Sequence, residues 1–335
     1  KSGTGVEFSD GTIQTTAATN GVGRKNAIIN GNFDIWQRGT SFTFNNTNGY
    51  TADRWLVTPG TGGTVVVSRQ VFTLGQTDVP NEPTYFLRID RTVAGSSQSY
   101  PIQKIESVRT FAGKTVTLSF YAKANTALAC TPYLEQIFGT GGSPSAQVNY
   151  SSTAVNLTTS WQKFTSVVSL SSISGKTLGT NNNDMLTVNC LLPTSGTYIF
   201  DIAQVQLEEG STATQFERRT TNDELILSQR YYEKSYNQAD APDTVAAGGD
   251  TFFVSTGAAN YRFTQTFNVS KRAVPTINIY NASLAGGTTI RNYTAVSDVA
   301  YTVVGNVTER MFNISPTTPV NENMYAFHWT ANAEL

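Results

Sequence analysis

The sequence predicts an all-β protein: a jelly-roll β-sandwich, a linker helix and a second, C-terminal β-sandwich. Short runs rich in Val, Thr, Tyr and Phe recur between clusters of Gly, Asn, Pro and Ser, as they do in antiparallel β-proteins. In "KTVTLSFYAK", the apolar Val116, Leu118 and Phe120 alternate with polar residues, which is the period of a half-buried strand. Many such runs with no helix between them favour a sandwich or jelly roll.

The strands of the first predicted domain follow one another over residues 26–216. The clearest runs are "GTVVVSRQVF", "TYFLRIDRT", "KTVTLSFYAK", "WQKFTSVVSL" and "GTYIFDIAQVQL". Turn signals such as "GTGGSP" and "GTNNND" separate them. Residues 1–25 are too few and too polar for a domain, so they are predicted to form an extended arm.

One segment differs from the rest, "TTNDELILSQRYYEKSY" at residues 220–236, because it contains neither Gly nor Pro. Thr221 and Glu224 have the spacing of a helix capping box. We therefore predict a linker helix within residues 217–239 and a C-terminal β-sandwich over residues 240–335. The helix has too many apolar residues for one narrow stripe, so it is expected to be covered from more than one side: Leu225, Ile226, Leu227, Tyr231 and Tyr232.

Composition excludes several classes of partner. Charged residues make up only 14% of the chain and the formal net charge is −1, so no electrostatic attraction to nucleic acid or anionic membranes is expected. No apolar run reaches the roughly 18 residues of a membrane span, which argues against membrane insertion. Cys130 and Cys190 lie in apolar strand-like runs. They are interpreted as two buried thiols, with a disulfide across the sandwich as the alternative.

Three stretches together resemble bacteriophage tail-fibre and receptor-binding proteins. "GVEFSDGTIQTTAAT" is similar to segments that lead into their head domains, which implies that residues 1–25 are the end of a fibre shaft. "NAIINGNFDIWQRGTSF" with "YTADRWLV" resembles the start of such a head domain, and "FDIAQVQLEEGSTATQFERRTTNDELILSQRYYEKSY" resembles its end and following helix. "FHWTANAEL" resembles the closing residues of the same proteins.

The same domain resembles jelly-roll carbohydrate-binding modules that contain calcium. The resemblance implies that the first and last strands are neighbours and that Asp34 and Asp201 meet to hold one structural calcium ion. Calcium accepts several oxygen ligands in a flexible geometry. Asp34 stands where many relatives carry Glu. The alternative is that both carboxylates accept hydrogen bonds from the backbone or from arginine.

No catalytic site is predicted. His328 is the only histidine of the chain and lies in the alternating run "MYAFHWTA", so we interpret it as a strand residue. Glycoside hydrolysis requires two carboxylates that flank a sugar. Glu106, Glu135, Asp90 and Asp184 are available, but no two are selected by their spacing.

A sugar site on a jelly roll requires aromatic faces for pyranose rings and polar groups for hydroxyls. Trp36, Trp55 and Trp161 are interpreted as core residues. Aromatic residues in or beside loops are the predicted ligand contacts: Tyr100, Tyr133, Phe138 and Tyr150. The C-terminal domain is an alternative place for the site, through Tyr280, Tyr293 or Tyr301.

The resemblance implies a phage tail protein of the virion, made in the host cytoplasm, that attaches the particle to a host surface glycan such as lipopolysaccharide or capsule. It implies a homotrimer joined to other tail proteins, with Leu225, Ile226 and Tyr232 near the three-fold axis. A monomer or dimer, with the helix folded against its own domains, is the alternative. Rival functions are a shaft or collar module without receptor contact, a tail-associated glycan depolymerase and a secreted carbohydrate-binding module.

Overall fold

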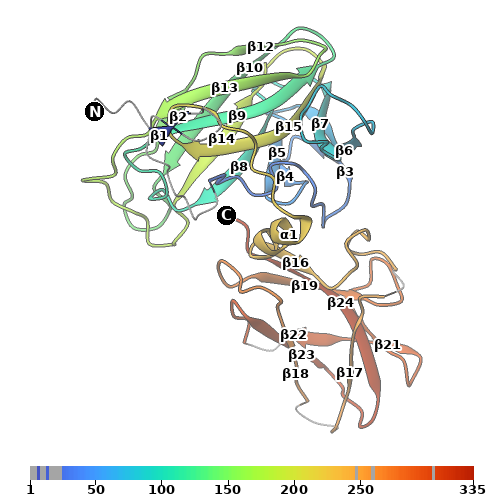
Figure 1. Cartoon of the computed structure of the whole chain (residues 1–335). Coiled ribbons are helices and arrows are strands. Elements are labelled where there is room, and N and C mark those ends of the chain that lie inside the picture. The colour runs from blue at the N-terminus through green and yellow to red at the C-terminus, as the bar shows by residue number, and fades with distance from the viewer. Residues whose placement is uncertain (1–5, 8–12, 15–24, 246–247, 258–260, 304–305) are drawn as a thin grey trace.

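The computed structural model describes residues 6–7, 13–14, 25–245, 248–257, 261–303 and 306–335. Two β-domains lie one above the other, with helix α1 (Thr221–Gln229) between them (Figure 1). This architecture confirms the predicted all-β class. Most of the predicted arm, residues 1–25, lies outside the described residues. Within it, β1 (Val6–Glu7) and β2 (Ile13–Gln14) form an antiparallel pair.

The first domain is a sandwich of two antiparallel sheets. The seven-stranded sheet has the order β11-β10-β14-β8-β5-β4, with β12 beside β10. Its strands are β4 (Gly49–Tyr50), β5 (Trp55–Thr58), β8 (Tyr100–Glu106), β10 (Leu128–Ile137), β11 (Val148–Ser151), β12 (Val155–Leu157) and β14 (Met185–Leu191).

The six-stranded sheet has the order β13-β9-β15-β7-β6-β3. Its strands are β3 (Ser41–Asn45), β6 (Thr64–Val71), β7 (Tyr85–Val93), β9 (Thr115–Ala124), β13 (Gln162–Ser169) and β15 (Tyr198–Glu209). From β7 to β10, and again from β12 to β15, each connection crosses from one sheet to the other. These crossings produce a jelly-roll connectivity.

The core of the first domain lies between the two sheets, and it contains the apolar residues that the alternation predicts to be buried. Val116, Leu118 and Phe120 of β9 are fully buried there. Thr117 and Ser119 are buried as well, so β9 is not the half-buried strand that its alternation predicts. Part of the reason is that the chain returns over the outside of the sheet, where Thr117 Oγ1 donates to the carbonyl of Gly210 over 2.8 Å.

The opening segment runs beside the last strand, as the resemblance implies. The Ala27 amide donates to the Leu207 carbonyl, and the Val205 amide donates to the Gly31 carbonyl, each over 2.9 Å. A Cβ atom at Gly31 would lie 2.2 Å from the Val205 carbonyl oxygen. Only glycine therefore allows the two segments to approach this closely.

The second domain begins earlier than predicted. Its main sheet has the order β16-β24-β20-β21, and β17 and β19 also pair with β24. A three-stranded sheet has the order β18-β23-β22. The strands are β16 (Tyr232–Lys234), β17 (Thr251–Val254), β18 (Phe263–Thr266), β19 (Thr276–Asn281), β20 (Ile290–Asn292), β21 (Ser297–Val299), β22 (Tyr301–Val303), β23 (Met311–Pro316) and β24 (Met324–Asn332).

Helix α1 is shorter than the predicted helix over residues 220–236. Its N-cap is Thr220, whose side chain accepts from the Asp223 amide, and not Thr221. Glu224 accepts from the Asn30 amide over 2.7 Å, instead of closing a capping box. The helix ends at Gln229 because the next residues enter the domain junction, where Tyr232 pairs with Asn332 of β24.

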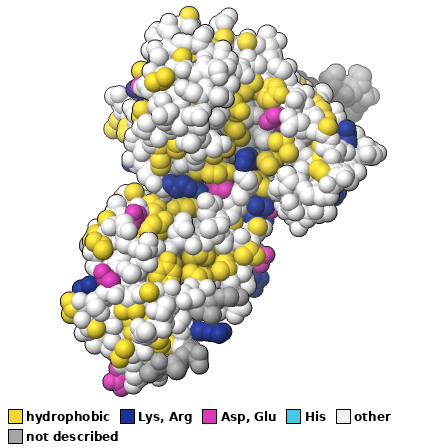
Figure 2. Space-filling model, turned by 180° about the vertical axis from the view of Figure 1, so that it is seen from behind, with side chains coloured by type: hydrophobic (Ala, Val, Ile, Leu, Met, Phe, Trp, Pro, Cys, Tyr) yellow, Lys and Arg dark blue, Asp and Glu magenta, His cyan; other side chains and the backbone are white. Residues whose placement is uncertain are grey.

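The junction between the domains is charged and hydrogen-bonded. The guanidinium group of Arg54 is buried and forms an ion pair with Glu334, and Arg230 binds Glu106 over 2.8 Å. Gln37 Nε2 donates to the Tyr232 carbonyl over 2.8 Å. Charged side chains gather at this junction in the space-filling view (Figure 2). These contacts tie the second domain to one end of the sandwich.

The two cysteines are buried free thiols on β10 and β14, which confirms the first interpretation and not the disulfide. A hydrogen bond with Cys190 and burial together raise the pKa of Cys130. Within the described part of the chain, no helix is long and apolar enough to span a membrane.

Candidate functional site

The outer side of the seven-stranded sheet carries a cluster of aromatic and polar side chains. Alternation along three adjacent strands turns them away from the core. The register places Tyr133 opposite Asn189, Glu135 opposite Thr187, and Asn189 opposite Ile102. We call this surface the open face, defined by Tyr100, Ile102, Tyr133, Glu135, Thr187 and Asn189.

Glu135 is the polar centre of the open face. Its Oε2 atom accepts from Thr187 Oγ1 over 2.8 Å and from Asn189 Nδ2 over 3.3 Å. Gln147 Nε2 approaches Oε1 at 3.4 Å. Among the described residues, Glu135 forms no ion pair. Its carboxylate is therefore held in place by neutral donors and keeps acceptor capacity for an incoming hydroxyl group.

Asn189 has an unused acceptor in the same place. The residue is only 1% exposed, and its Nδ2 donates to both Glu135 and Thr187. Its Oδ1 has no hydrogen-bond partner in the described chain. A buried acceptor without a partner costs about 1–3 kcal/mol. A ligand that donates a hydrogen bond at this position would recover that free energy.

Two tyrosines flank these polar groups. Tyr100 and Tyr133 are half-buried, and neither hydroxyl forms a hydrogen bond with another described residue. Burial, and then the nearby carboxylate of Glu135, raise the pKa of each phenol. Both rings are therefore neutral at physiological pH, and each presents an aromatic surface beside hydrogen-bonding groups.

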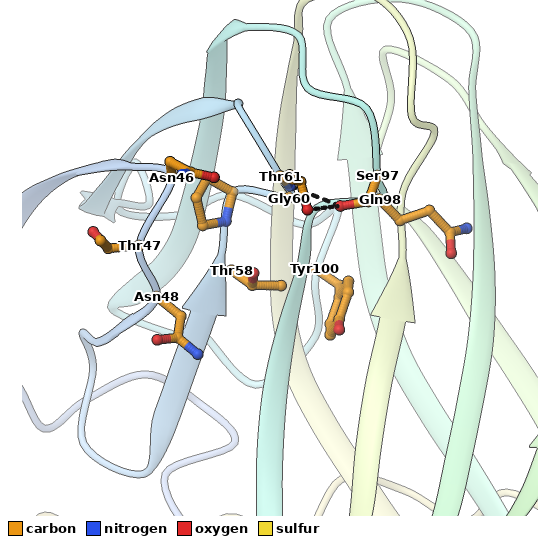
Figure 3. A pocket seen from close by; sticks show the side chains of 10 residues that line it. Asn46, Thr47, Asn48, Thr58, Gly60, Thr61, Ser97, Gln98 and Tyr100 are labelled. Carbon is orange, nitrogen blue, oxygen red and sulfur yellow. Dashed lines mark hydrogen bonds between the residues drawn. The ribbon is translucent and has the colours of Figure 1, made fainter.

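A pocket of about 570 Å³ adjoins the open face at Tyr100 (Figure 3). Thr58 of β5 and Tyr100 of β8 are cross-strand partners in its floor. The remaining lining is made mostly of hydroxyl and amide side chains from three loops: Asn46, Thr47, Asn48, Thr61, Ser97 and Gln98. Ser97 Oγ accepts from the Thr61 amide and Asn46 Oδ1 accepts from the Gly62 amide, each over 2.7 Å, which holds these loops together.

Of the four predicted ligand residues, the structure brings Tyr100 and Tyr133 together and separates the other two. Phe138 is 1% exposed and packs in the interior, which corrects its placement on an exposed loop. Tyr150 packs against the core, and its hydroxyl donates to Gln136 Oε1 over 2.6 Å. The prediction missed Asn189 and Thr187, whose outward alternation in "MLTVNCL" was the available signal.

Asp34 and Asp201 have separate partners, which do not fit a shared calcium site. Both carboxylate oxygens of Asp201 accept from Arg88, at 2.7 and 2.8 Å. Asp34 accepts from Asn32 Nδ2 over 2.9 Å, and burial raises its pKa. No group of three or more His, Cys, Asp or Glu residues suited to a metal ion occurs among the described residues. For Asp201, the structure shows the alternative, an arginine partner.

The assignment of Trp161 to the core is wrong, whereas those of Trp36 and Trp55 are confirmed. Trp36 and Trp55 are buried in the core of the first domain, as predicted. Trp161 is instead half-buried on the outer side of the six-stranded sheet, with its ring 5.2 Å from both Phe72 and Phe86. We call this second surface the covered face, defined by Phe72, Phe86, Arg88, Lys123, Trp161 and Asp201.

His328 lies in β24, as predicted. Its Nδ1 is 3.1 Å from Ser235 Oγ, and its Nε2 is 2.8 Å from Asp250 Oδ1. Serine, histidine and aspartate in line resemble a nucleophilic triad. However, His328 is fully buried with its ring stacked on Tyr236, and Ser235 Oγ accepts from the Trp329 amide. No substrate can reach this imidazole, so we assign the three residues a structural role.

The predicted oligomer residues differ in exposure. Ile226 is 44% exposed, Leu225 is half-buried, and Tyr232 is buried. The guanidinium carbon of Arg38 lies 3.6 Å from the centre of the Tyr232 ring. This contact occupies Tyr232 within its own chain, which corrects its placement on a three-fold axis. Tyr280 is half-buried against Tyr236, whereas Tyr293 is exposed beside Phe252.

No protein-family model matches the chain, and no curated protein matches it. Partial likenesses to solved structures exist. The enzymatically active domain of bacteriophage CBA120 tailspike protein 4 is 14% identical over 55% of this chain, with a TM-score of 0.33, and the match spans only 21% of that chain.

Two carbohydrate-binding modules match over most of their own length. The CBM22-2 xylan-binding domain of Paenibacillus barcinonensis Xyn10C is 14% identical over 50% of this chain and 99% of its own, with a TM-score of 0.34. The family 11 module of Clostridium thermocellum, solved with a mixed-linked tetrasaccharide, is 10% identical over 51% of this chain and 96% of its own, with a TM-score of 0.31. At these TM-scores the fold assignment rests on the strand order described above.

Proposed function

We propose that this chain is a non-enzymatic, glycan-binding protein of a phage tail, which attaches the virion to the host cell surface through the open face. The observation that carries the proposal is Asn189 Oδ1, a buried acceptor without a partner among the described residues, which lies between two half-buried tyrosine rings. Sugars offer hydroxyl donors and an apolar ring face, and these are the two features that such a surface complements.

Binding rather than cleavage is supported by the carboxylates. A glycosidase of the common type places two carboxyl groups on opposite sides of one bond. Among the residues that define the open face, Glu135 is the one acid. Glu106 also points outward from β8, but it is bound by Arg230 and by the Tyr231 hydroxyl at the domain junction. Glu135 forms no ion pair among the described residues, so its carboxylate can accept hydrogen bonds from sugar hydroxyl groups, but one carboxylate does not supply the pair that such a glycosidase needs.

Three parts of the proposal follow from the sequence resemblance: the chain belongs to a phage particle, it assembles as a homotrimer, and it contacts other tail proteins. Three weak sites on one rigid assembly would convert low single-site affinity into useful avidity. Ile226 on α1 is exposed and available for such an assembly. Mass measurement of the purified chain in solution tests this part directly, because a monomeric mass would contradict it.

The experiment that tests the function measures binding of the fluorescent chain to intact candidate host cells before and after periodate oxidation of their glycans. Binding that periodate abolishes is the expected result. Absence of binding to a host that the parent phage infects would contradict the proposal. It would favour the rival function, a shaft or collar module that does not touch the receptor.

A further inference from the structure

A second cleft, of about 400 Å³, lies where the first domain meets α1. The first domain contributes Asp34, Thr40, Arg69 and Tyr85 to its lining. Helix α1 contributes Thr221 and Leu225, and the segment after β16 contributes Gln238 and Ala239. The volume is within the range of small-molecule sites, and the cleft is built from different strands from those of the open face.

Arg69 is the distinctive group of this cleft. Its guanidinium carbon lies 4.5 Å from the centre of the Tyr85 ring, and its side chain forms no ion pair or hydrogen bond with another described residue. The ring contact fixes a planar cation with unused donors at the wall of the cleft. A guanidinium group in this state suits the bidentate recognition of a carboxylate or a phosphate group.

The rest of the lining suits a hydroxylated ring. Asp34 uses one carboxylate oxygen to accept from Asn32, and Thr40, Thr221 and Gln238 add exposed hydroxyl and amide groups. Leu225 and the buried Trp36 supply apolar contact. A simple inorganic anion would make no contact with these hydroxyl, amide and apolar groups. The carboxylate of Asp34 would also repel a ligand that carries several negative charges.

We propose that this cleft is a binding site for an anionic saccharide unit, whose carboxylate or phosphate group is held by Arg69 and whose ring hydroxyls face Asp34. The site is separate from the open face and does not depend on it. Because its walls come from both the sandwich and α1 with the following segment, an occupied cleft also braces the junction between the domains.

The test uses the whole chain and measures binding by titration calorimetry and saturation-transfer NMR. The probes are glucuronic acid, glucose 1-phosphate, glucose and inorganic phosphate. Glucuronic acid represents an acidic sugar, and glucose 1-phosphate represents a phosphorylated glycan. At least one of these two is expected to bind ten-fold or more tightly than glucose and than inorganic phosphate, and which one binds identifies the anion. Equal binding of glucose, or equal binding of inorganic phosphate, would overturn the proposal.

Variants locate the site. Arg69→Gln should lose at least ten-fold in affinity for the anionic sugar, and Arg69→Lys should lose less because it keeps the charge without the planar donors. Arg109→Gln removes an exposed arginine elsewhere on the first domain and should change nothing. Leu225→Trp should fill the cleft and block binding. Unchanged binding in folded Arg69→Gln or in Leu225→Trp would overturn the proposal. Tyr133→Ala, on the open face, should leave this binding intact.

Discussion

The two outer faces of the jelly roll are made from similar alternating strands, but the central carboxylate of each face has different hydrogen-bond partners. On the covered face, Asp201 is bound at both oxygens by Arg88, with Lys123 at 3.9 Å. On the open face, Glu135 is held by the neutral groups of Thr187 and Asn189. A charge satisfied by the chain's own cation stabilises the fold, whereas a charge held by neutral donors remains available to a ligand.

The aromatic residues show the same contrast. Phe72, Phe86 and Trp161 pack on one another at ring distances of 4.8–5.2 Å, and the Lys123 ammonium lies 5.2 Å from the Trp161 ring. Tyr100 and Tyr133 have no aromatic partner among the described residues. Aromatic residues that pack together serve stability, while separated and accessible ones serve recognition. The four predictions below test this division, in order of decreasing effect.

The largest effect is expected on the covered face. Replacing Arg88 by Met removes the bidentate partner of the buried Asp201 carboxylate and leaves it only the more distant Lys123, at 3.9 Å. Loss of one partner of a fully buried pair costs about 3–5 kcal/mol. Because the Arg88 side chain is 31% exposed, we expect the free energy of unfolding to fall by about 2–3 kcal/mol, measured by urea denaturation. Arg109→Met is the matched control, and equal stability of the two variants would contradict the assignment.

On the open face, Tyr133→Ala should weaken glycan binding about ten-fold, or roughly 1.4 kcal/mol, because it removes an aromatic contact surface. The free energy of unfolding should change by less than about 0.5 kcal/mol, as at other surface positions. Trp161→Ala should show the reverse, with lower stability and unchanged binding. If Trp161→Ala loses the glycan and Tyr133→Ala keeps it, the two faces have been assigned the wrong way round.

A smaller effect is expected at Asn189. Asn189→Ala should weaken glycan binding about five-fold, or roughly 1 kcal/mol, since the ligand loses one buried acceptor. Asn306→Ala, at an exposed position of the second domain, is the control. Titration of both variants with the same glycan measures the difference. Identical affinities would show that the unpartnered Oδ1 atom is not a ligand contact.

The smallest effect is expected from pH. Burial and Glu135 raise the pKa of Tyr100 and Tyr133 above the ordinary value of about 10. Both phenols therefore stay protonated as the pH rises from 7 to 9.5. The glycan affinity should change less than about two-fold over this interval. Loss of binding with a midpoint below pH 9.5 would mean that a tyrosine of lowered pKa, or another group, controls recognition.

Local patterns predicted much of the fold. Alternation in "KTVTLSFYAK" identified the residues that β9 buries against the core. The resemblance implied that the first and last strands are neighbours, and Gly31 of the opening segment does approach Val205 of β15 closely. The helix end was wrong because periodicity does not show where a chain enters a domain junction. Tyr232 reads as part of the helix, but it pairs in β16 and packs under Arg38.

The site was only partly predictable, because it depends on strand order. Tyr100 and Tyr133 are distant in sequence and share a surface because β14 lies between β8 and β10. Asn189, on that middle strand, alternates with apolar residues in "MLTVNCL", but its place beside the two tyrosines depends on the strand order. Phe138 and Tyr150 lie on the two sides of one loop, but Phe138 is buried and Tyr150 packs against the core. Pairing between distant strands decides which aromatic residues reach a ligand.

The measurement that tests the open face most directly is binding of three proteins to host-cell polysaccharide immobilised on a biosensor. The proteins are the unmodified chain, the double variant Tyr100→Ala/Tyr133→Ala, and Trp161→Ala. We predict that the double variant loses at least ten-fold in affinity while keeping its melting temperature, and that Trp161→Ala binds like the unmodified chain. A folded double variant that binds normally would contradict the assignment of the open face as the glycan-binding surface.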